Sequence, residues 1–282
     1  MSAQTLTSVI MVTYHTGPVL EAAIKAILAQ TANVELILVN NGNPPEVEEK
    51  LIEQFKEDPC VRVMTGHGNV GLSKAVNLGA RVARGEHLFL LNPRCCIQPD
   101  VVARLVEQGQ AIKEPYVLGC RLMDSRGKET KSSRRAILTP QTVLIESLGL
   151  YRFYPKLRLR FHEEPVPEKV SPVPAISSSC MFLSRKSFFD MKGFIELFET
   201  HIAGMDFCHR FLCSGGTVYF VPDIEIVLAD KQTKVDRIQL EKDRARNLVC
   251  YFHENFSDRF FQPLLWSLYA FIWLRAGIRM FI

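Results

Sequence analysis

From residue 8 to about residue 121, short apolar runs alternate with amphipathic segments. The apolar runs are SVIMVTY, VELILV, VRVMT, EHLFLL and YVLGCR, and segments such as PVLEAAIKAILAQ separate them. Strands that alternate with helices form a mostly parallel sheet with helices on both faces. Such sheets bind ligands beyond the carboxyl ends of their strands. The sequence therefore predicts an α/β fold with one ligand-binding mouth, formed by the loops after Tyr14, Val39, Thr65 and Leu91. Further along, TVYFVP and IEIVL are interpreted as a pair of strands.

Gly66, Gly68 and Gly71 have the GxGxxG spacing that is typical of dinucleotide-binding turns. A strand-like run precedes them, a helix-like run follows, and Glu86 lies at a spacing that suits a ribose contact. The dinucleotide motif normally occupies the first strand-to-helix turn of a chain. Here that first turn is TYHTGP, which has a single glycine. A nicotinamide-dependent enzyme is therefore disfavoured.

Composition indicates an ordinary folded protein, with 47% hydrophobic and 23% charged residues in 282. The net charge of +4 is mild and gives no indication of a nucleic-acid partner. Basic residues cluster at 126–135 and 152–161, which fits either a solvated loop or an anionic partner such as a phospholipid surface or a lipid diphosphate. The eight cysteines lack CxxC spacing, so we expect reduced, mostly buried thiols in a cytoplasmic protein. The N-terminal sequence has no signal-peptide pattern.

The chain closes with RFFQPLLWSLYAFIWLRAGIRMFI, in which an apolar stretch runs from Leu264 to Leu274 and is followed by Arg275 and Arg279. This stretch is shorter than the roughly 20 residues that span a bilayer. Aromatic and aliphatic residues beside arginines suit a helix that lies in the membrane interface. The alternative is a helix that packs on the domain or on a second subunit. We expect a cytoplasmic protein that is peripheral to the inner face of the membrane.

In this order, the segments SVIMVTYHTGPVLEAAIKAILAQ, ELILVNNGN, NVGLSKAVNLGARVARGEHLFLLNPR, CMFLSRKSFFDMKGFIELF and GMDFCHRFLCSGGTVYFVPD resemble glycosyltransferase family 2. More narrowly, they resemble its bacterial rhamnosyltransferase-like branch. The resemblance implies a GT-A fold, a Rossmann-like, mostly parallel mixed sheet flanked by helices, here with a C-terminal amphipathic and hydrophobic helical tail. It divides the chain into a nucleotide-sugar-binding half (1–121), a basic insertion or mobile loop region (122–171), an acceptor-side half (172–232) and C-terminal helices (233–282).

The resemblance also implies inverting transfer of a sugar from a UDP- or dTDP-sugar to a glycan or lipid-linked acceptor, in cell-surface polysaccharide biosynthesis. Matching positions would bind the donor, and others would lie on the acceptor side. The donor-binding positions are Thr13, Tyr14, Asn40, Asn41, Asn69, Gly71, Lys74, Asn92 and Arg94. The acceptor-side positions are Ser178, Ser179 and His201.

Two donor positions depart from the family pattern. Asn40 stands where the family usually has an aspartate, although its carbonyl can still accept a hydrogen bond from the base. Arg94 replaces the carboxylate that helps to hold Mg²⁺ or Mn²⁺ in the family. Arginine only donates hydrogen bonds and cannot ligate a cation, but it can contact a diphosphate directly. We therefore assign no metal ligand.

The catalytic positions depart further. Ala203 and Gly204 occupy the places of a Glu-Asp pair whose aspartate is the general base, and Leu228 occupies the place of a histidine. Asp206 is the carboxylate left nearby and is our candidate base, with His201 and His209 as alternatives. The spacing of these three residues matches no standard metal site.

Two functions remain open at this point. One is an active glycosyltransferase in which Arg94 supplies the charge that a metal would otherwise provide. The other is a catalytically inactive member of the family that acts as a binding or scaffold subunit, with a membrane or protein partner at its C-terminal tail. Removing one positioned acid or base typically costs about 10²- to 10⁴-fold in rate, so the loss of several catalytic groups keeps the second function in view.

Overall fold

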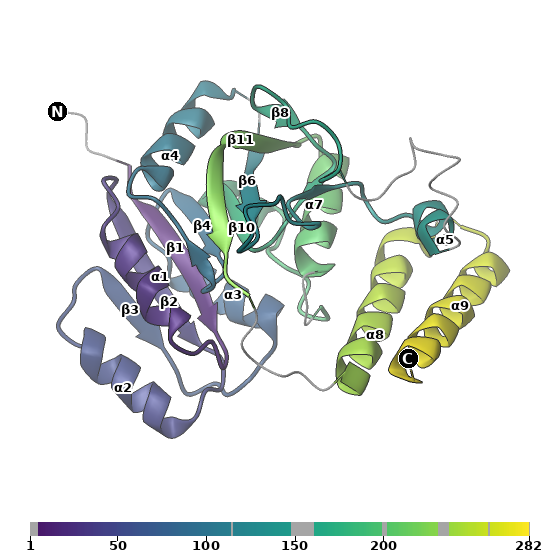
Figure 1. Ribbon diagram of the computed structural model, residues 1–282, viewed down its shortest axis with the longest axis horizontal. Helices are drawn as coiled ribbons and strands as arrows, with labels where there is room; N and C mark the ends of the chain where they lie inside the picture. Colours follow the sequence, from purple (N-terminus) through teal and green to yellow (C-terminus); the bar gives the residue numbers. More distant parts are fainter. Residues whose placement is uncertain are drawn as a thin grey trace.

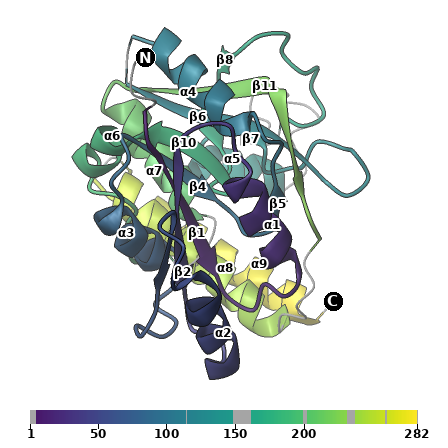
Figure 2. The same cartoon turned by 90° about the vertical axis from the view of Figure 1, so that its left-hand side faces the viewer.

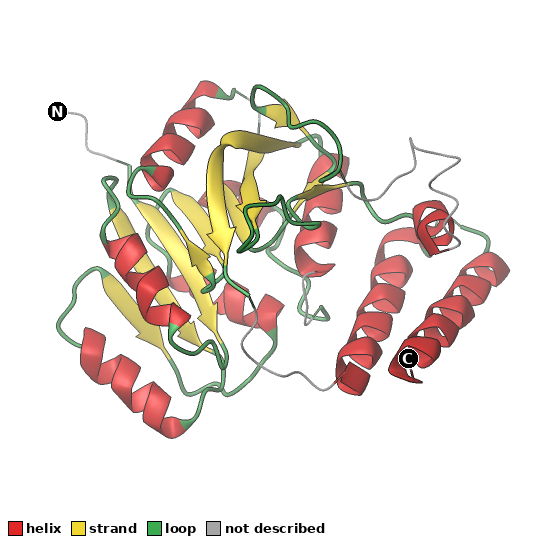
Figure 3. Ribbon diagram, viewed as in Figure 1, coloured by secondary structure: helices red, strands yellow, loops and turns green. Residues whose placement is uncertain are grey.

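A nine-stranded mixed sheet forms the centre of the part of the chain that the computed structural model describes, residues 5–113, 115–147, 161–198, 202–230, 237–258 and 260–281 (Figures 1 and 3). The elements, in chain order, are β1 Thr7–Thr13, α1 Val19–Leu28, β2 Val34–Asn40, α2 Pro45–Phe55, β3 Val61–Met64, α3 Leu72–Val82, β4 His87–Leu91, β5 Cys95–Cys96, α4 Val101–Ala111, β6 Tyr116–Met123, β7 Arg134–Arg135, α5 Pro140–Ser147, β8 Ser171–Pro172, β9 Ala175–Ile176, β10 Cys180–Ser184, α6 Arg185–Asp190, α7 Ile202–Cys213, β11 Thr217–Leu228, α8 Arg237–Phe256 and α9 Gln262–Phe281.

The strand order is β3-β2-β1-β4-β10-β6-β11-β5, and β8 pairs with β11 away from this path. Strands β3, β2, β1 and β4 pair in parallel, whereas β10 runs antiparallel between β4 and β6. The predicted α/β fold with a mostly parallel mixed sheet is therefore confirmed. The carboxyl ends of β1, β2, β3 and β4 lie at one edge, where the sequence predicts the ligand-binding mouth.

Side chains of β1 alternate between two buried layers. Ile10 packs with α3 and α7 on one face of the sheet, whereas Val9 and Met11 pack with α1, α2 and α4 on the other. Figure 2 shows α3 and α1 on opposite sides of β1. This period of two is what a strand buried on both faces requires, and it explains the uninterrupted apolar run SVIMV.

One strand expectation was wrong. The segments TVYFVP and IEIVL form a single strand, β11, and not a strand pair. Its pairing with β6 shifts register between Val221 and Glu225, beside Pro222. Proline cannot donate a ladder hydrogen bond and occurs at such irregularities, so the strand continues past it with a local interruption.

The C-terminal helices α8 and α9 form a hairpin that packs on α7, on the side away from the sheet (Figure 1). Tyr251 and Phe252 of α8 and Leu265 and Leu268 of α9 are buried in the core that these helices share. The predicted C-terminal helical tail is therefore confirmed. Within the described ranges, no helix is both long and apolar enough to cross a membrane.

The region 122–171 includes the end of β6, the short strand β7 and helix α5. Strand β7 pairs with β9 in a separate two-stranded sheet. Most of the basic run 152–161 lies outside the described residues. The division of the chain at residues 121, 171 and 232 stays a prediction.

Candidate functional site

The loops after β1 and β2 meet at the carboxyl edge of the sheet. Thr13 and Asn40, the last residues of these strands, are direct partners in the parallel register. The backbone N–H of Asn41 donates to the carbonyl of Thr13 at 2.9 Å, and Thr13 is buried with its Oγ1 3.0 Å from that of Thr16. The structure thus brings Thr13, Asn40 and Asn41 together.

Asn40 points into the protein. It is 1% exposed, its Oδ1 accepts from Nδ2 of Asn43 at 2.6 Å, and its Nδ2 donates to Oε2 of Glu48 at 2.6 Å. Nδ2 of Asn43 also donates to the carbonyl of Thr13 at 3.0 Å. Both ends of the Asn40 amide therefore stabilise the loop after β2. This geometry does not support the expected contact between Asn40 and a nucleobase.

Asn41 joins the loop after β2 to the entrance of α3. Its Nδ2 donates to Oδ1 of Asn69 at 3.0 Å, and its Oδ1 accepts from the backbone N–H of Val70 at 3.1 Å. Oδ1 of Asn69 also accepts from the N–H of Gly71, which precedes α3 and has a φ of +80°. At Gly42, where φ is +86°, a Cβ would lie 2.7 Å from the backbone nitrogen of Asn69, so this close approach requires glycine.

Tyr14 is a donor-site candidate that presents its side chain to solvent. It is 50% exposed, and its ring lies edge-on to that of His15 with centroids 4.5 Å apart. The backbone of His15 has a φ of +47° and donates its N–H to Oδ1 of Asn43 at 2.6 Å. Lys74 is also exposed, in the first turn of α3. These two residues, one aromatic and one cationic, can reach a ligand at the mouth without breaking the buried network.

Arg94 lies just beyond the end of β4 and is half-buried. Its Nη1 donates to the carbonyl of Ala229 at 2.7 Å, and the N–H of Ala229 donates back to the carbonyl of Arg94 at 2.9 Å. Asn92 accepts from the N–H of Arg94 through Oδ1 and donates its own N–H to the carbonyl of Ser179. Arg94, Asn92 and Ser179 are thus brought together. A guanidinium has five N–H donors, and the hydrogen bond to Ala229 uses one of them.

The positions of the family's Glu-Asp pair are closed by packing. Ala203 is fully buried, and a Cβ on Gly204 would lie 2.5 Å from Cβ of Ser178 and 3.0 Å from its backbone nitrogen. The first turn of α7 therefore rests directly on Ser178. A carboxylate at residue 204 does not fit unless one of these segments moves.

Asp206 of α7 is held inside the protein by an ion pair and a hydrogen bond. It is fully buried, its Oδ2 accepts from Nε of Arg210 at 2.7 Å, and its Oδ1 accepts from Nδ2 of Asn255 at 2.9 Å. Arg210 donates in turn to the carbonyls of Met191 and Gly193. This ion pair connects α7 to α8 and to the turn after α6. Both oxygens of Asp206 thus accept hydrogen bonds from the protein, and this geometry does not support the predicted role of catalytic base.

Of the two alternative bases, the structure describes His209. The ring of His209 stacks on Phe256 with centroids 5.3 Å apart, and its Nδ1 lies 3.4 Å from the hydroxyl of Tyr251. It therefore belongs to the contact between α7 and α8. His201 lies outside the described residues. In the described parts of the chain, no three His, Cys, Asp or Glu residues are grouped so that they could hold a metal ion.

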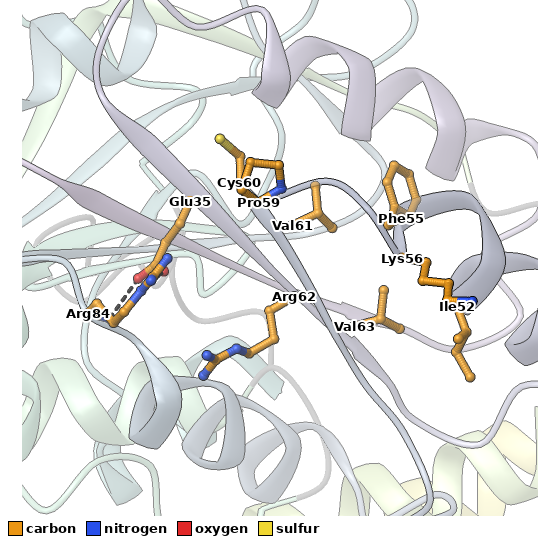
Figure 4. A pocket seen from close by; sticks show the side chains of 10 residues that line it. All are labelled: Glu35, Ile52, Phe55, Lys56, Pro59, Cys60, Val61, Arg62, Val63 and Arg84. Carbon is orange, nitrogen blue, oxygen red and sulfur yellow. Dashed lines mark hydrogen bonds and ion pairs between the residues drawn. The ribbon is translucent and has the colours of Figure 1, made fainter.

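A separate hollow of about 370 Å³ lies beside the edge strand β3 and the end of α2 (Figure 4). Arg84 and Glu35 lie at one side of it, and Glu35 stands at the start of β2, at the opposite end of that strand from Asn40. Glu35 accepts from Oγ of Ser8 and from Nε and the backbone N–H of Arg84. Burial by itself raises the pKa of the Glu35 carboxyl, but these hydrogen bonds outweigh burial and hold the pKa below its usual value. The hollow is remote from the mouth.

Several residues that shape the site were missed by the sequence interpretation. Asn43 and Glu48 complete the network around Asn40, and Arg210 and Asn255 bind Asp206. The run NNGN carried a usable signal for Asn43, because Asn beside Gly at a strand end is typical of a hydrogen-bonded turn. The sequence carries no comparable signal for Asn255, which is 49 residues from Asp206.

The fold resembles those of solved glycosyltransferase structures. One is GalNAc-T7 with UDP, GalNAc and Mn²⁺, with a TM-score of 0.62 and 18% identity over 82% of this chain and 45% of that chain. Another is the mannosyltransferase PcManGT from Pyrobaculum calidifontis in complex with GDP-Man and Mn²⁺, with a TM-score of 0.61 and 17% identity over 99% of this chain and 73% of that one. At these identities the likeness shows the fold alone.

Sequence relatives point to the same family. The chain is 24% identical to the N-acetylglucosaminyl-diphospho-decaprenol L-rhamnosyltransferase of Mycobacterium tuberculosis, over 96% of this chain and 91% of the relative. It is 23% identical to the glycosyltransferase GlyG of Streptococcus pneumoniae, over 90% of this chain and 80% of the relative. It is 31% identical to the glycosyltransferase EpsJ of Bacillus subtilis, over 48% of this chain and only 38% of that relative's length. The model of the family "Glycosyl transferase family 2" matches residues 8–190. The resemblance inferred from the sequence is therefore confirmed, and the chain belongs to glycosyl transferase family 2.

Proposed function

We propose that the chain binds a UDP- or dTDP-sugar at the mouth of the sheet and does not transfer the sugar, so that it acts as a binding or scaffold subunit in cell-surface polysaccharide biosynthesis. One observation carries this proposal: the position of the family's general base is a glycine in direct contact with Ser178. Inverting transfer needs a base that removes the proton of the acceptor hydroxyl as it attacks the anomeric carbon. The nearest carboxylate along α7, Asp206, is bonded to Arg210 and Asn255.

Donor binding is supported by three exposed or half-buried side chains around the buried network. The exposed Tyr14 ring offers a face for a nucleobase, and Arg94 and Lys74 offer positive charge for the diphosphate. Mg²⁺ or Mn²⁺ does not fit the position that the family uses, because Arg94 presents donors there and no acceptor. We therefore propose that donor binding does not depend on a metal.

Active transfer is the second candidate, because Arg94 stands at the strand end where the family neutralises the departing diphosphate. In that case the acceptor would be a glycan or a lipid-linked saccharide. The lipid-linked class is supported by the name of the Mycobacterium tuberculosis relative, which specifies a diphospho-decaprenol acceptor. In either case we place the protein at the cytoplasmic face of the membrane, with the C-terminal helices as the surface for a membrane or a protein partner.

Calorimetric titration of the purified protein with UDP- and dTDP-sugars, in Mn²⁺ and in chelator, tests the proposal. We expect binding that chelator does not change and no release of UDP or dTDP when lipid-linked and glycan acceptors are added. Release of the nucleotide in proportion to sugar transferred would overturn the inactive assignment, and the absence of binding in both conditions would overturn donor binding.

The variant Arg94→Ala tests whether Arg94 contacts the diphosphate of the donor. Loss of the contact to the diphosphate should lower the affinity on the order of tenfold to a hundredfold, the usual range for a charged hydrogen bond. Arg81→Ala, a largely exposed residue of α3 whose nearest carboxylate is 3.7 Å away, is the matched control and should leave the affinity unchanged. Thermal unfolding of both variants separates lost binding from lost folding, because Arg94 also bonds Ala229.

A further inference from the structure

Helix α9 buries one face and exposes the other. Its buried face packs against α8 and comprises Leu265, Leu268, Ile272 and Ala276. Its exposed apolar residues are Leu264, Trp266, Trp273, Leu274 and Ile278. With about 100° per residue, Trp266, Trp273, Leu274 and Ile278 fall on the half of the helix opposite the buried residues, and Leu264 lies at the edge of that half. We call this half the apolar face of α9.

The apolar face carries no charge. The other described residues on this half of the helix are uncharged too: Pro263, Ser267, Ala270, Phe271 and Gly277. Residues 262–281 include no aspartate or glutamate. Trp266 and Trp273 are 63% and 44% exposed and are the two tryptophans of the chain. Large, rigid aromatic side chains with a polar N–H are typical of residues at a membrane interface.

Positive charge borders the apolar face on one side. Arg275 lies at the boundary between the exposed and buried halves of α9, and Arg279 follows one turn later on the side toward α8. With Arg244 of α8 the two arginines line a hollow of about 100 Å³. Glu241 also lines this hollow and bonds Arg244. The hairpin therefore presents an apolar face beside a cationic border.

We propose that α9 docks the protein on the surface of an anionic phospholipid bilayer, with the two tryptophans at the boundary of headgroups and acyl chains and the border arginines on lipid phosphates. The charge pattern favours this occupant, because anionic headgroups complement the arginines while the acyl region accepts the uncharged face. Helix α9 is the outermost element of the hairpin, on the right of Figure 1, so the face is presented away from the sheet. This inference does not depend on donor binding or on catalysis.

Tryptophan fluorescence of the full chain tests the docking, because both reporters lie on the apolar face. Vesicles of phosphatidylcholine that also contain phosphatidylglycerol should shift the emission to the blue, and vesicles of phosphatidylcholine alone should shift it less. Added salt should weaken the response, because it screens the arginines. Arg275→Gln with Arg279→Gln should lower the affinity for the anionic vesicles and should not change the weak response to neutral ones.

Vesicle co-sedimentation tests the apolar contribution. Trp266→Ser with Trp273→Ser should lower the affinity on the order of tenfold or more, from the apolar area removed. Val47→Ser with Ile52→Ser is the matched control, since both are exposed apolar residues of α2, far from α9 in Figure 1, and it should sediment like the unaltered chain. Denaturant unfolding of each variant checks its folding.

Two results would overturn the proposal. One is that the unaltered chain neither shifts its emission nor sediments with anionic vesicles. The other is that the tryptophan variant sediments unchanged, or that its main effect in sedimentation velocity is to dissociate a dimer, because the face would then cover a second copy of the chain.

Discussion

The loops after β1 and β2 and the first turn of α7 serve the same predicted site, but they differ in what they leave accessible. At the loops, a buried hydrogen-bond network around Asn40 and Asn41 stabilises the predicted ligand-binding edge of the sheet, and Tyr14 is exposed there. At α7, Gly204 rests on Ser178 and Asp206 is bonded inside the protein. Binding an anionic ligand requires positive charge and hydrogen-bond donors, whereas abstracting a proton requires an accessible base. A protein can therefore keep the first capacity after it has lost the second.

Asp206→Ala is expected to have the largest effect on stability. It leaves the guanidinium of Arg210 largely buried without its counter-charge, which should lower the free energy of unfolding by about 3–5 kcal/mol. Denaturant unfolding measures the change. Asp190→Ala breaks the exposed pair with Lys186 and should cost less than about 1 kcal/mol. A loss at residue 206 as small as that at residue 190 would contradict the structural role of Asp206 and make it a candidate base again.

Gly204→Ala tests whether packing closes the base position. The added methyl group would lie 2.5 Å from Cβ of Ser178, and overpacking of this kind costs about 1–3 kcal/mol. Ser178→Gly in the same chain should recover most of the loss of unfolding free energy. Gly277→Ala in α9, where a Cβ meets no atom within 4 Å, is the control and should be neutral or stabilising. If Gly204→Ala is as harmless as the control, a carboxylate at residue 204 would be tolerated.

Asn40→Asp restores the residue that the family usually has. It would place a carboxylate against Oε2 of Glu48, which now accepts from the Asn40 amide at 2.6 Å. The repulsion should lower the free energy of unfolding by about 1–2 kcal/mol at neutral pH, and the loss should fade in acid as one of the two carboxylates is protonated. Denaturant unfolding with and without Glu48→Gln measures this coupling, and the double variant should be close to the unaltered chain. A higher affinity for UDP with no loss of unfolding free energy would instead make residue 40 a ligand-binding position.

The parts of the fold that follow from local patterns could be predicted from the sequence. The alternation of apolar and amphipathic runs predicted β1 to β4 and the helices between them, because β1, β2 and β4 are buried on both faces and each helix carries one apolar stripe. The break at Pro222 was misinterpreted as the end of a strand, since pairing with β6 on both sides of it is a property of the sheet and not of the segment.

The candidate site was less predictable because its chemistry depends on long-range contacts. The motifs located Asn40, Arg94 and Asp206 in sequence, but their roles depend on partners that are distant in the chain. Arg94 bonds Ala229 and Asp206 bonds Asn255, and no local pattern connects these residues. Whether a polar side chain faces a ligand or the protein interior was therefore decided only by the structure.

Glu35→Gln has the smallest expected effect and tests the amino end of the same donor-side strands. The pKa of Glu35 is below its usual value, so the ionised carboxylate stabilises the fold above the unfolded-state pKa, and this contribution is lost as the pH falls through the folded-state value. The variant should lose about 1 kcal/mol of unfolding free energy at neutral pH, and its stability should then fall less on acidification than that of the unaltered chain. Unfolding titrations across the acidic range measure how the free energy of unfolding of each protein depends on pH.

Glu21→Gln in the exposed pair with Lys50 is the control and should change this pH dependence little, because solvent screens that pair. Because Glu35 lies at the opposite end of β2 from Asn40, nucleotide-sugar affinity should not change, and a loss of affinity would show that the two ends of these strands are coupled.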